Sequence, residues 1–186
     1  MTEERAAVLA AVATRIDRLQ RPALVAVDGA TAAGKTTFAN DLVPLLAGVV
    51  VRVSIDDFHR PEAERYARGK GPESYYHDTF DLQAVHVALG RVRDDEIAIV
   101  DGVFLLRREL AGLWHLTIYL SADPQVALER AIARDAAWMD GEAAARARYA
   151  SRYVPGETLY LDEVDPESRA DVVVETTDPL RPRLIR

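Results

Sequence analysis

The stretch Leu24-Val25-Ala26-Val27-Asp28-Gly29-Ala30-Thr31-Ala32-Ala33-Gly34-Lys35-Thr36-Thr37 decides the fold of this chain. An apolar run typical of a buried strand leads into the pattern G-x-x-x-x-G-K-T, and a helical pattern follows it. A phosphate-binding loop needs that setting, with a strand before it and a helix after it. The sequence therefore predicts a bound nucleoside triphosphate, held by Gly29, Ala30, Thr31, Ala32, Ala33, Gly34, Lys35, Thr36 and Thr37.

The residue types in this loop suit the chemistry of a triphosphate. Gly29 and Gly34 can take backbone angles closed to other residues and let the main chain approach the phosphates. Successive N–H groups and the N-terminus of the following helix point at an anion. Lys35 supplies a compact positive charge, and the Thr36 hydroxyl is placed for Mg²⁺. Of the 23 basic residues only Lys35 and Lys70 are lysines, so a slim ammonium stands where a planar guanidinium would not fit.

The composition, 49% hydrophobic and 28% charged, is that of an ordinary soluble globule. At 186 residues, the chain is predicted to form one domain over residues 1–186. A net charge of −7 argues against binding to a nucleic-acid polymer. The absence of cysteine excludes disulfides and thiolate chemistry. With no apolar run of membrane length and no signal-peptide core, we expect no membrane partner and a cytoplasmic location.

Short apolar runs alternate with helical patterns along the rest of the chain. Strands are predicted at residues 23–28, 49–54, 97–100, 115–120 and 171–174. Helices are predicted at residues 3–20, from 35 to about 46, at 81–90, from 124 onward and at 141–153. Residues 60–80 are polar, with glycines and prolines, and we expect a long functional loop or short helices there. The alternation predicts an α/β, three-layer P-loop NTPase fold with a parallel sheet between helices and a helical lid.

Acidic residues follow three of the predicted strands, as Asp28, Asp56-Asp57 and Asp101. Ligands bind at the carboxyl ends of the strands in such sheets. Phosphoryl transfer needs a base for the acceptor hydroxyl, and Asp56 or Asp57 suits this role, with Asp56 favoured. Asp101 follows its strand in the manner of a Walker B acid. The predicted Mg²⁺ ligands are Thr36, Asp101 and Asp56.

Arginines gather in the C-terminal half of the chain. Arg130 and Arg134 lie four residues apart on one face of a predicted helix. We interpret residues of about 130–156 as a lid whose arginines fold over the transferring phosphate, with Arg130 and Arg134 first among them. The alternative is a solvated face, in which Arg146, Arg148 and Arg152 pair with acidic residues such as Glu129, Asp135 and Glu142.

Polar and aromatic side chains flank the segment of about 60–80, which we interpret as an acceptor loop. The predicted acceptor-binding residues are Asp57, His59, Tyr75, Tyr76 and His77, with Asp78 and Asp81 nearby. Hydroxyls and carboxylates of this kind could bind a polyol, and a packed surface loop is the alternative. No motif surrounds His86 or His115, so we expect them in the core or on the surface.

These motifs, in this order and spacing, resemble the uridine kinase and phosphoribulokinase branch of the P-loop kinases, and most of all bacterial uridine kinase-like proteins. The resemblance covers nearly the whole chain, and residues 27–37, 53–59, 75–81, 100–104, 130–135 and 152–155 carry it. It implies a kinase that uses ATP and Mg²⁺ and acts on a small-molecule acceptor. It also implies Asp56 as the base, Asp101 as the acidic residue before a glycine, and Arg130 and Arg134 as lid arginines.

The resemblance is incomplete where the family reads its acceptor. Uridine–cytidine kinases have a β-hairpin whose Tyr and His read the pyrimidine, and the short segment between Asp81 and Ile97 leaves no counterpart of it. Tyr75 falls near the position of the family's ribose-binding Asp. A nucleoside such as uridine or cytidine is the expected acceptor. Pantothenate, a sugar phosphate, glycerate or another small alcohol are the alternatives, and residues 71–75 weakly resemble pantothenate kinases.

Two other classes of protein use the same loop. A regulatory GTPase carries an N-K-x-D motif, which this sequence lacks. An ATP-binding protein without turnover would bind nucleotide and release no ADP, and the joint presence of Lys35, Thr36, Asp56 and Asp101 argues against it. The sequence does not select ATP over GTP. It also leaves open a homo-oligomer, because the N-terminal helix could pack on its own domain or on a second subunit.

Overall fold

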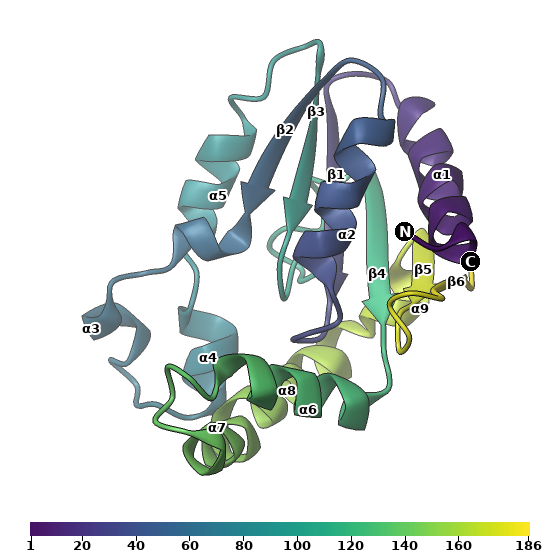
Figure 1. The fold of residues 1–186 in the computed structure, drawn as a ribbon. Helices are drawn as coiled ribbons and strands as arrows, with labels where there is room; N and C mark the ends of the chain where they lie inside the picture. The colour runs from purple at the N-terminus through teal and green to yellow at the C-terminus, as the bar shows by residue number, and fades with distance from the viewer.

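The computed structural model describes residues 1–186 and has a six-stranded sheet at its centre (Figure 1). The strand order is β2-β3-β1-β4-β5-β6. The strands are β1 (Ala23–Gly29), β2 (Val49–Ser54), β3 (Glu96–Asp101), β4 (Leu116–Ser121), β5 (Val172–Glu175) and β6 (Arg183–Leu184). The first five are parallel to their neighbours, as predicted. β6 is antiparallel to β5, and its two residues gave no strand signal in the sequence.

Helices cover the sheet and gather at the carboxyl ends of its strands (Figure 1). They are α1 (Glu3–Asp17), α2 (Lys35–Leu42), α3 (Glu62–Arg65), α4 (Pro72–Asp78), α5 (Leu82–Leu89), α6 (Pro124–Asp135), α7 (Glu142–Arg148), α8 (Val154–Val164) and α9 (Pro166–Arg169). Short turns of other helix types are η1 (Val43–Leu45), η2 (Ile55–Phe58) and η3 (Tyr149–Tyr153). None of these helices is both long and apolar enough to cross a membrane.

Each face of the sheet has its own hydrophobic core, because successive side chains of a strand point to opposite faces. Val25 and Val27 of β1 join the core under α1 and α2, whereas Ala26 between them joins the opposite core. That opposite core contains large aromatic side chains, among them Tyr76 and Phe104. A layer of helices on each face of a mostly parallel sheet is the three-layer α/β arrangement predicted from the sequence.

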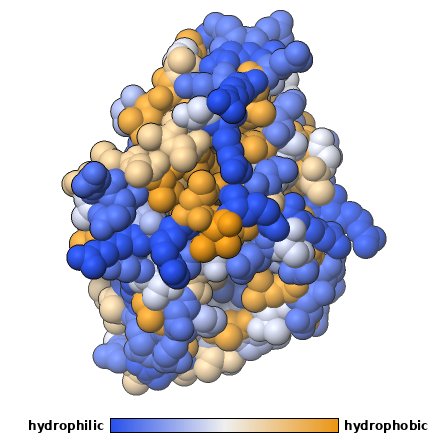
Figure 2. All heavy atoms as spheres, turned by 90° about the vertical axis from the view of Figure 1, so that its right-hand side faces the viewer, coloured by the Kyte–Doolittle hydropathy of each residue, from blue (hydrophilic) through white to orange (hydrophobic).

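The N-terminal helix α1 packs on its own sheet. Its apolar residues Leu9, Val12 and Ile16 are fully buried in the core that contains β1 and α2. Figure 2 views the molecule from the side that carries α1 and β6, and this face mixes hydrophilic and hydrophobic residues. The exposed apolar residues of this part of the chain include Leu180 and Ile185.

Two predicted helix boundaries differ from the structure. The helix that starts at Lys35 ends at Leu42, and a 3-10 turn that contains Pro44 follows. The helical segment predicted to end at 153 instead continues through the π-helical turn η3 into α8. Pro155 lies in the first turn of α8, where the missing N–H of proline costs no helical hydrogen bond. Proline at this position therefore does not end the helical segment.

Candidate active site

The phosphate-binding loop, residues 29–36, joins the end of β1 to the start of α2. Gly29 has a φ of +150°, and a Cβ there would lie 2.5 Å from the carbonyl oxygen of Leu120 on β4. Only glycine therefore fits where the loop leaves the sheet. The N–H groups of Gly34, Lys35 and Thr36 donate no hydrogen bond to any protein atom. They are the free donors at a helix N-terminus that an anion satisfies.

Lys35 points from the start of α2 into the site. Its Nζ donates to the carbonyl oxygens of Gly29 at 2.9 Å and Ala30 at 2.8 Å, so the loop itself fixes the ammonium. Burial lowers the pKa of Lys35, and the negative charges of Glu157, Asp28 and Asp56 oppose this shift. A cation held in a low-dielectric site interacts strongly with an incoming phosphate.

Asp101 at the end of β3 connects the loop to β2. Its Oδ2 accepts a hydrogen bond from Thr36 Oγ1 at 2.5 Å, and its Oδ1 pairs with Arg52 at 2.6 Å. A hydroxyl and a carboxylate oxygen are the hard ligands that Mg²⁺ prefers in triphosphate sites. The donor set at Thr36 and Asp101 therefore fits the predicted metal. Arg52 was not predicted, although one arginine within the run Val49–Ser54 is a sequence signal that could have shown it.

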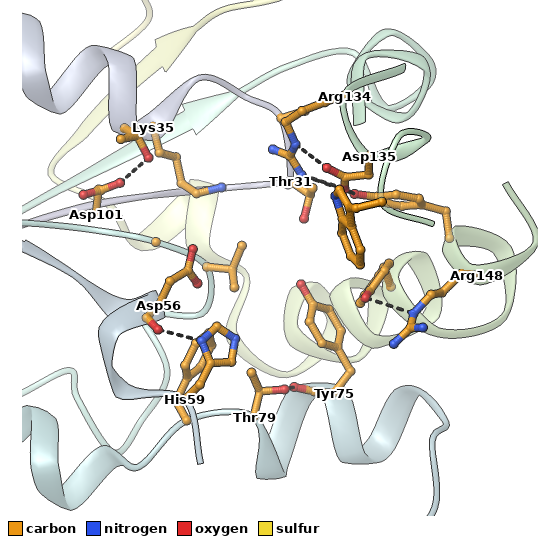
Figure 3. A pocket seen from close by; sticks show the side chains of 18 of the residues that line it. Thr31, Lys35, Asp56, His59, Tyr75, Thr79, Asp101, Arg134, Asp135 and Arg148 are labelled. Atoms are coloured by element: carbon orange, nitrogen blue, oxygen red, sulfur yellow. Dashed lines mark hydrogen bonds and ion pairs between the residues drawn. The ribbon is translucent and has the colours of Figure 1, made fainter. Parts of the chain in front are cut away.

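Asp56 lies in η2, directly after β2, and faces the cavity (Figure 3). The Asp56 N–H donates to Ser54 Oγ, which holds the start of this turn. Gly102, after β3, lets the turn pack closely, because a Cβ there would lie 1.9 Å from Cγ2 of Ile55. Two adjacent strand ends thus bring Asp56 beside Asp101. Asp57 does not line the cavity, so only Asp56 of the two candidates has the geometry of a base.

Arg130 and Arg134 of α6 both line the cavity, as their spacing predicts. Arg130 donates to the carbonyl oxygens of Thr176 and Thr177, which follow β5. Arg134 forms two hydrogen bonds with Asp135, with the Nε contact at 2.7 Å, and this carboxylate raises the pKa of Arg134. Arg146, in contrast, pairs with the exposed Glu129 and Glu142 outside the cavity, which is the solvated alternative.

The predicted acceptor residues do not all lie at the cavity. His59 and Tyr75 line the cavity together with Thr79 and Phe80. Tyr76 is buried in the core behind them, where Arg107 lies 4.8 Å from its ring centroid. The remaining predicted residues point elsewhere: His77 faces Glu73, Asp78 pairs with Arg68, and Asp81 caps α5. Of the five predicted acceptor-binding residues, Asp57, Tyr76 and His77 therefore do not line the cavity.

Two carboxylates beside the loop accept hydrogen bonds from the protein itself. Asp28 was grouped with the acidic strand ends, but its side chain is fully buried and accepts from the N–H groups of Gly29 and Leu106 and from the Tyr160 hydroxyl. Burial raises the pKa of Asp28, and it does not reach the cavity. Glu157 of α8, which the sequence analysis missed, accepts from the N–H and hydroxyl of Thr31. Burial also raises the pKa of Glu157.

These elements enclose one cavity of about 880 Å³, large for a small-molecule site. Figure 3 shows Lys35 and Asp56 reaching it from one side and Arg134 and Arg148 from the other. The cavity wall comes from the phosphate-binding loop, the ends of β2 and β3, the segment of 59–80 and the helices α6 and α7 with η3. The site therefore combines a cradle for anions, a carboxylate base candidate and room for a second molecule.

Solved structures share this fold. A possible uridine kinase from Bacillus stearothermophilus matches with a TM-score of 0.70 at 23% identity, over 91% of this chain and 96% of that one. A candidate fructose transport system kinase from Silicibacter sp. TM1040 also has a TM-score of 0.70, at 24% identity, over 87% of this chain and 95% of that one. The YGR205w protein matches at 0.63 and 13% identity, over 96% and 99%.

The comparisons confirm the predicted fold, because the chain is arranged like these proteins over nearly its whole length. No family model matches the sequence. Identities below 25% show a common fold and leave the chemistry of this chain to the residues of its own cavity.

Proposed function

We propose that the protein is a kinase that transfers the γ-phosphate of ATP, with Mg²⁺, to a hydroxyl group of a small molecule. One observation carries this proposal: Lys35, with the free N–H groups of its loop, and Asp56 face the same cavity (Figure 3). Phosphoryl transfer requires an anion cradle and a base for the acceptor hydroxyl in such proximity. The negative charge of Asp56 also opposes the lowering of the Lys35 pKa, as expected of two side chains that line one cavity.

The residues divide the reaction between them. The loop N–H groups and Lys35 hold the phosphates, and Thr36 with Asp101 would hold Mg²⁺, which neutralises phosphate charge when bound. Asp56 accepts the proton of the acceptor hydroxyl. The hydroxyl oxygen of the acceptor attacks the γ-phosphorus, and the bond from this phosphorus to the bridging oxygen breaks, so that ADP leaves. Arg130 and Arg134 stabilise the equatorial phosphate oxygens from α6.

Residues 1–186 form one kinase domain in this proposed function. Residues of about 60–80 form its acceptor segment, and residues of about 130–156 form its lid. The segments meet across the cavity, because His59 and Tyr75 line it from one side and Arg134 and Arg148 from the other (Figure 3). A lid that supplies arginines to the phosphates would also exclude water, which protects ATP from hydrolysis.

Two acceptor classes have support. The resemblance favours a nucleoside such as uridine or cytidine, and the exposed Trp138 on the cavity wall offers a surface for a flat base. A non-nucleoside alcohol, such as pantothenate, a sugar phosphate or glycerate, is favoured by the charged groups at the acceptor end.

The test is ADP release from Mg·ATP with a panel of acceptors: uridine, cytidine, other nucleosides, pantothenate, ribulose 5-phosphate, glycerate and simple sugars. We expect at least one to stimulate release. Asp56→Asn should lower that rate by about 100- to 10,000-fold and leave nucleotide affinity unchanged. Asp57→Asn is the matched control, since its side chain lies outside the cavity, and it should keep wild-type turnover.

Three results would contradict the proposal. Wild-type turnover in Asp56→Asn would remove Asp56 as the base. Nucleotide binding with no stimulation by any acceptor would favour an ATP-binding protein without turnover. Equal loss of turnover in Asp57→Asn would mean that the negative charge of the turn matters, rather than the position of Asp56.

A further inference from the structure

Four cations surround the ring of Tyr66 at the end of the cavity formed by the acceptor segment. Lys70 Nζ lies 4.8 Å, Arg152 Cζ 5.0 Å and Arg65 Cζ 5.5 Å from the centroid of that ring. Arg148 donates to the Tyr66 hydroxyl at 3.3 Å. Arg65, Tyr66 and Arg148 line the cavity, and Arg152 lies behind them. We call Arg65, Lys70, Arg148 and Arg152 the Tyr66 cation cluster.

None of these four cations forms an ion pair. Three arginines close by in the chain do: Arg60 with Glu64, Arg68 with Asp78, and Arg146 with Glu129 and Glu142. The contrast is marked in a protein with a net charge of −7, where carboxylates are plentiful. Glu62 also lines the cavity from α3, so the cluster keeps an excess of positive charge with this carboxylate included.

Two of the three guanidinium groups of the cluster carry a buried donor without an acceptor. Arg152 is 4% exposed and donates to the Gly71 carbonyl at 3.0 Å and to Ser74 Oγ at 2.8 Å, yet its Nε has no partner. The Nε of Arg65 is likewise buried and unpaired. A buried charge without a counter-charge is costly, and contacts with aromatic rings offset only part of that cost. This end of the cavity therefore carries positive charge that no ion pair within the protein compensates.

The cluster is separate from the groups that hold the triphosphate. The charges that act most strongly on Lys35 belong to Glu157, Asp28, Asp56 and Arg134, and none belongs to the cluster. The cluster is built from α3, the segment that follows it, α7 and η3, whereas the phosphate-binding loop lies between β1 and α2. Asp56 and His59, in and beside η2, also face the cavity and complete the acceptor side.

We propose that the acceptor is a small hydroxyl compound that also carries an anionic group, a phosphate monoester or a carboxylate, and that Arg65 and Arg148 bind this group. This inference rests on the proposed kinase activity. The acceptor spans the cavity, with its hydroxyl at Asp56 and its anionic group at the cluster. Guanidinium groups suit both kinds of oxyanion, because their planar forks bind two oxygens at once. A neutral nucleoside would leave the cluster without a counter-charge.

The first test measures anion binding without turnover. Protein saturated with a non-hydrolysable ATP analogue and Mg²⁺, so that the phosphate-binding loop is filled, is titrated calorimetrically with inorganic phosphate and, separately, with acetate. We expect binding of at least one anion, weakened by about 10- to 100-fold in Arg148→Met and Arg65→Met. Arg146→Met is the control, two residues from Arg148 and paired outside the cavity, and it should bind as wild type does. Comparing the affinities for phosphate and acetate shows whether the site prefers a phosphate group or a carboxylate.

The second test measures turnover with matched acceptors. ADP release is compared for ribulose 5-phosphate against ribulose, glycerate against glycerol, and pantothenate against pantothenol, with uridine as the neutral nucleoside. We expect one anionic member to be preferred, with its KM raised by about 10- to 100-fold in Arg148→Met and the KM of ATP unchanged. Circular dichroism and thermal unfolding of each variant show whether it folds.

The outcomes separate the inference from the function on which it rests. Absence of anion binding to the nucleotide-loaded wild type would overturn the inference. So would preference for uridine with an unchanged KM in Arg148→Met. Anion binding that depends on Arg148, with no ADP release from any acceptor, would support the anion site and overturn the kinase activity. Equal losses in Arg146→Met would show a general charge effect and overturn the assignment to the cluster.

Discussion

The nucleotide end and the acceptor end of the cavity differ in how their charged side chains are partnered. At the nucleotide end, Lys35 is fixed by two carbonyl oxygens, and Asp101 is held by Thr36 and Arg52. At the acceptor end, the Tyr66 cation cluster has no carboxylate partner. The first end keeps its geometry by bonds within the protein. The second holds positive charge that no ion pair within the protein compensates.

The two ends also differ in how the chain builds them. The nucleotide end comes mainly from one contiguous loop and the ends of adjacent strands, so its side chains have little freedom to rearrange. The acceptor end joins segments about 80 residues apart in sequence, as in the 3.3 Å contact of Arg148 with Tyr66. Substitutions in a site assembled from short helices can alter the specificity for the acceptor without disturbing the loop that holds the triphosphate. This difference separates nucleotide chemistry from acceptor selection.

Substituting the two lysines of the chain tests most directly whether the two ends of the cavity have separate roles, because Lys35 lies at the nucleotide end and Lys70 at the acceptor end. Lys35→Ala should lower kcat/KM for ATP by about 1,000-fold, since it removes a charge aimed at the transferring phosphate. Lys70→Ala should leave kcat/KM for ATP unchanged and raise the KM of the acceptor by about 10-fold. Steady-state kinetics with each substrate varied in turn measure both effects.

The outcome for the lysines bears on the whole site. Normal use of ATP by Lys35→Ala would mean that the phosphate-binding loop has been misinterpreted. A lower kcat/KM for ATP in Lys70→Ala would place part of the triphosphate at the cation cluster, and the two ends would no longer be separate. Thermal unfolding of both variants controls for loss of the fold.

Two glycines test the same comparison through the backbone. Gly29→Ala should destabilise the protein by at least about 2 kcal/mol, because φ is +150° and the new Cβ would meet the Leu120 carbonyl at 2.5 Å. Gly71→Ala, at the acceptor end, has a negative φ and no atom within 4 Å of the new Cβ. Its stability should stay within about 1 kcal/mol of wild type. Urea denaturation measures both changes.

Equal stability of the two glycine variants would contradict the close packing of the loop against β4. A large loss in Gly71→Ala alone would show that the acceptor end is the more constrained region. The first result would remove the order of rigidity that the hydrogen bonds indicate, and the second would reverse it.

The nucleotide end could be predicted from the sequence because its information is local. The loop from Gly29 to Thr36 contains its own signature, and a strand end places Asp56 and Asp101 by topology alone. The acceptor end could be predicted only in part. Tyr75, Tyr76 and His77 were grouped as neighbours in sequence, but consecutive residues of a helix point in different directions. Only Tyr75 faces the cavity, together with Thr79 four residues later.

Contacts between distant segments account for what the sequence did not show. Glu157 meets Thr31 across 126 residues, and no local pattern indicates such a contact. The Tyr66 cation cluster likewise forms when η3 packs near α3 and α4, which depends on the continuation of the helix past 153. A proline two residues after a helical pattern usually predicts its end, so the sequence around Pro155 gives no local signal of this continuation.

The smallest expected effect concerns Glu157, the carboxylate that holds the loop at the nucleotide end. Burial raises the pKa of Glu157, so the folded state binds more protons than the unfolded state between the two pKa values. The free energy of unfolding therefore falls as pH rises from the unfolded pKa to the raised folded pKa, and it stays lower above that. Glu157→Gln keeps an acceptor for Thr31 and cannot ionise. The free energy of unfolding of Glu157→Gln should therefore fall less with pH and exceed that of the wild type by about 1 kcal/mol at pH 7.

Urea denaturation from pH 4 to pH 8 measures that profile, and Glu62→Gln is the control, because its side chain is exposed and has no ion pair. Glu62→Gln should follow the wild-type curve. An unchanged slope in Glu157→Gln would mean that Glu157 ionises as readily in the folded protein as in the unfolded chain. The charge of Lys35 would then compensate the carboxylate fully. A flattened slope would instead show that the nucleotide end keeps a buried acid beside its lysine, whereas the acceptor end keeps cations without any.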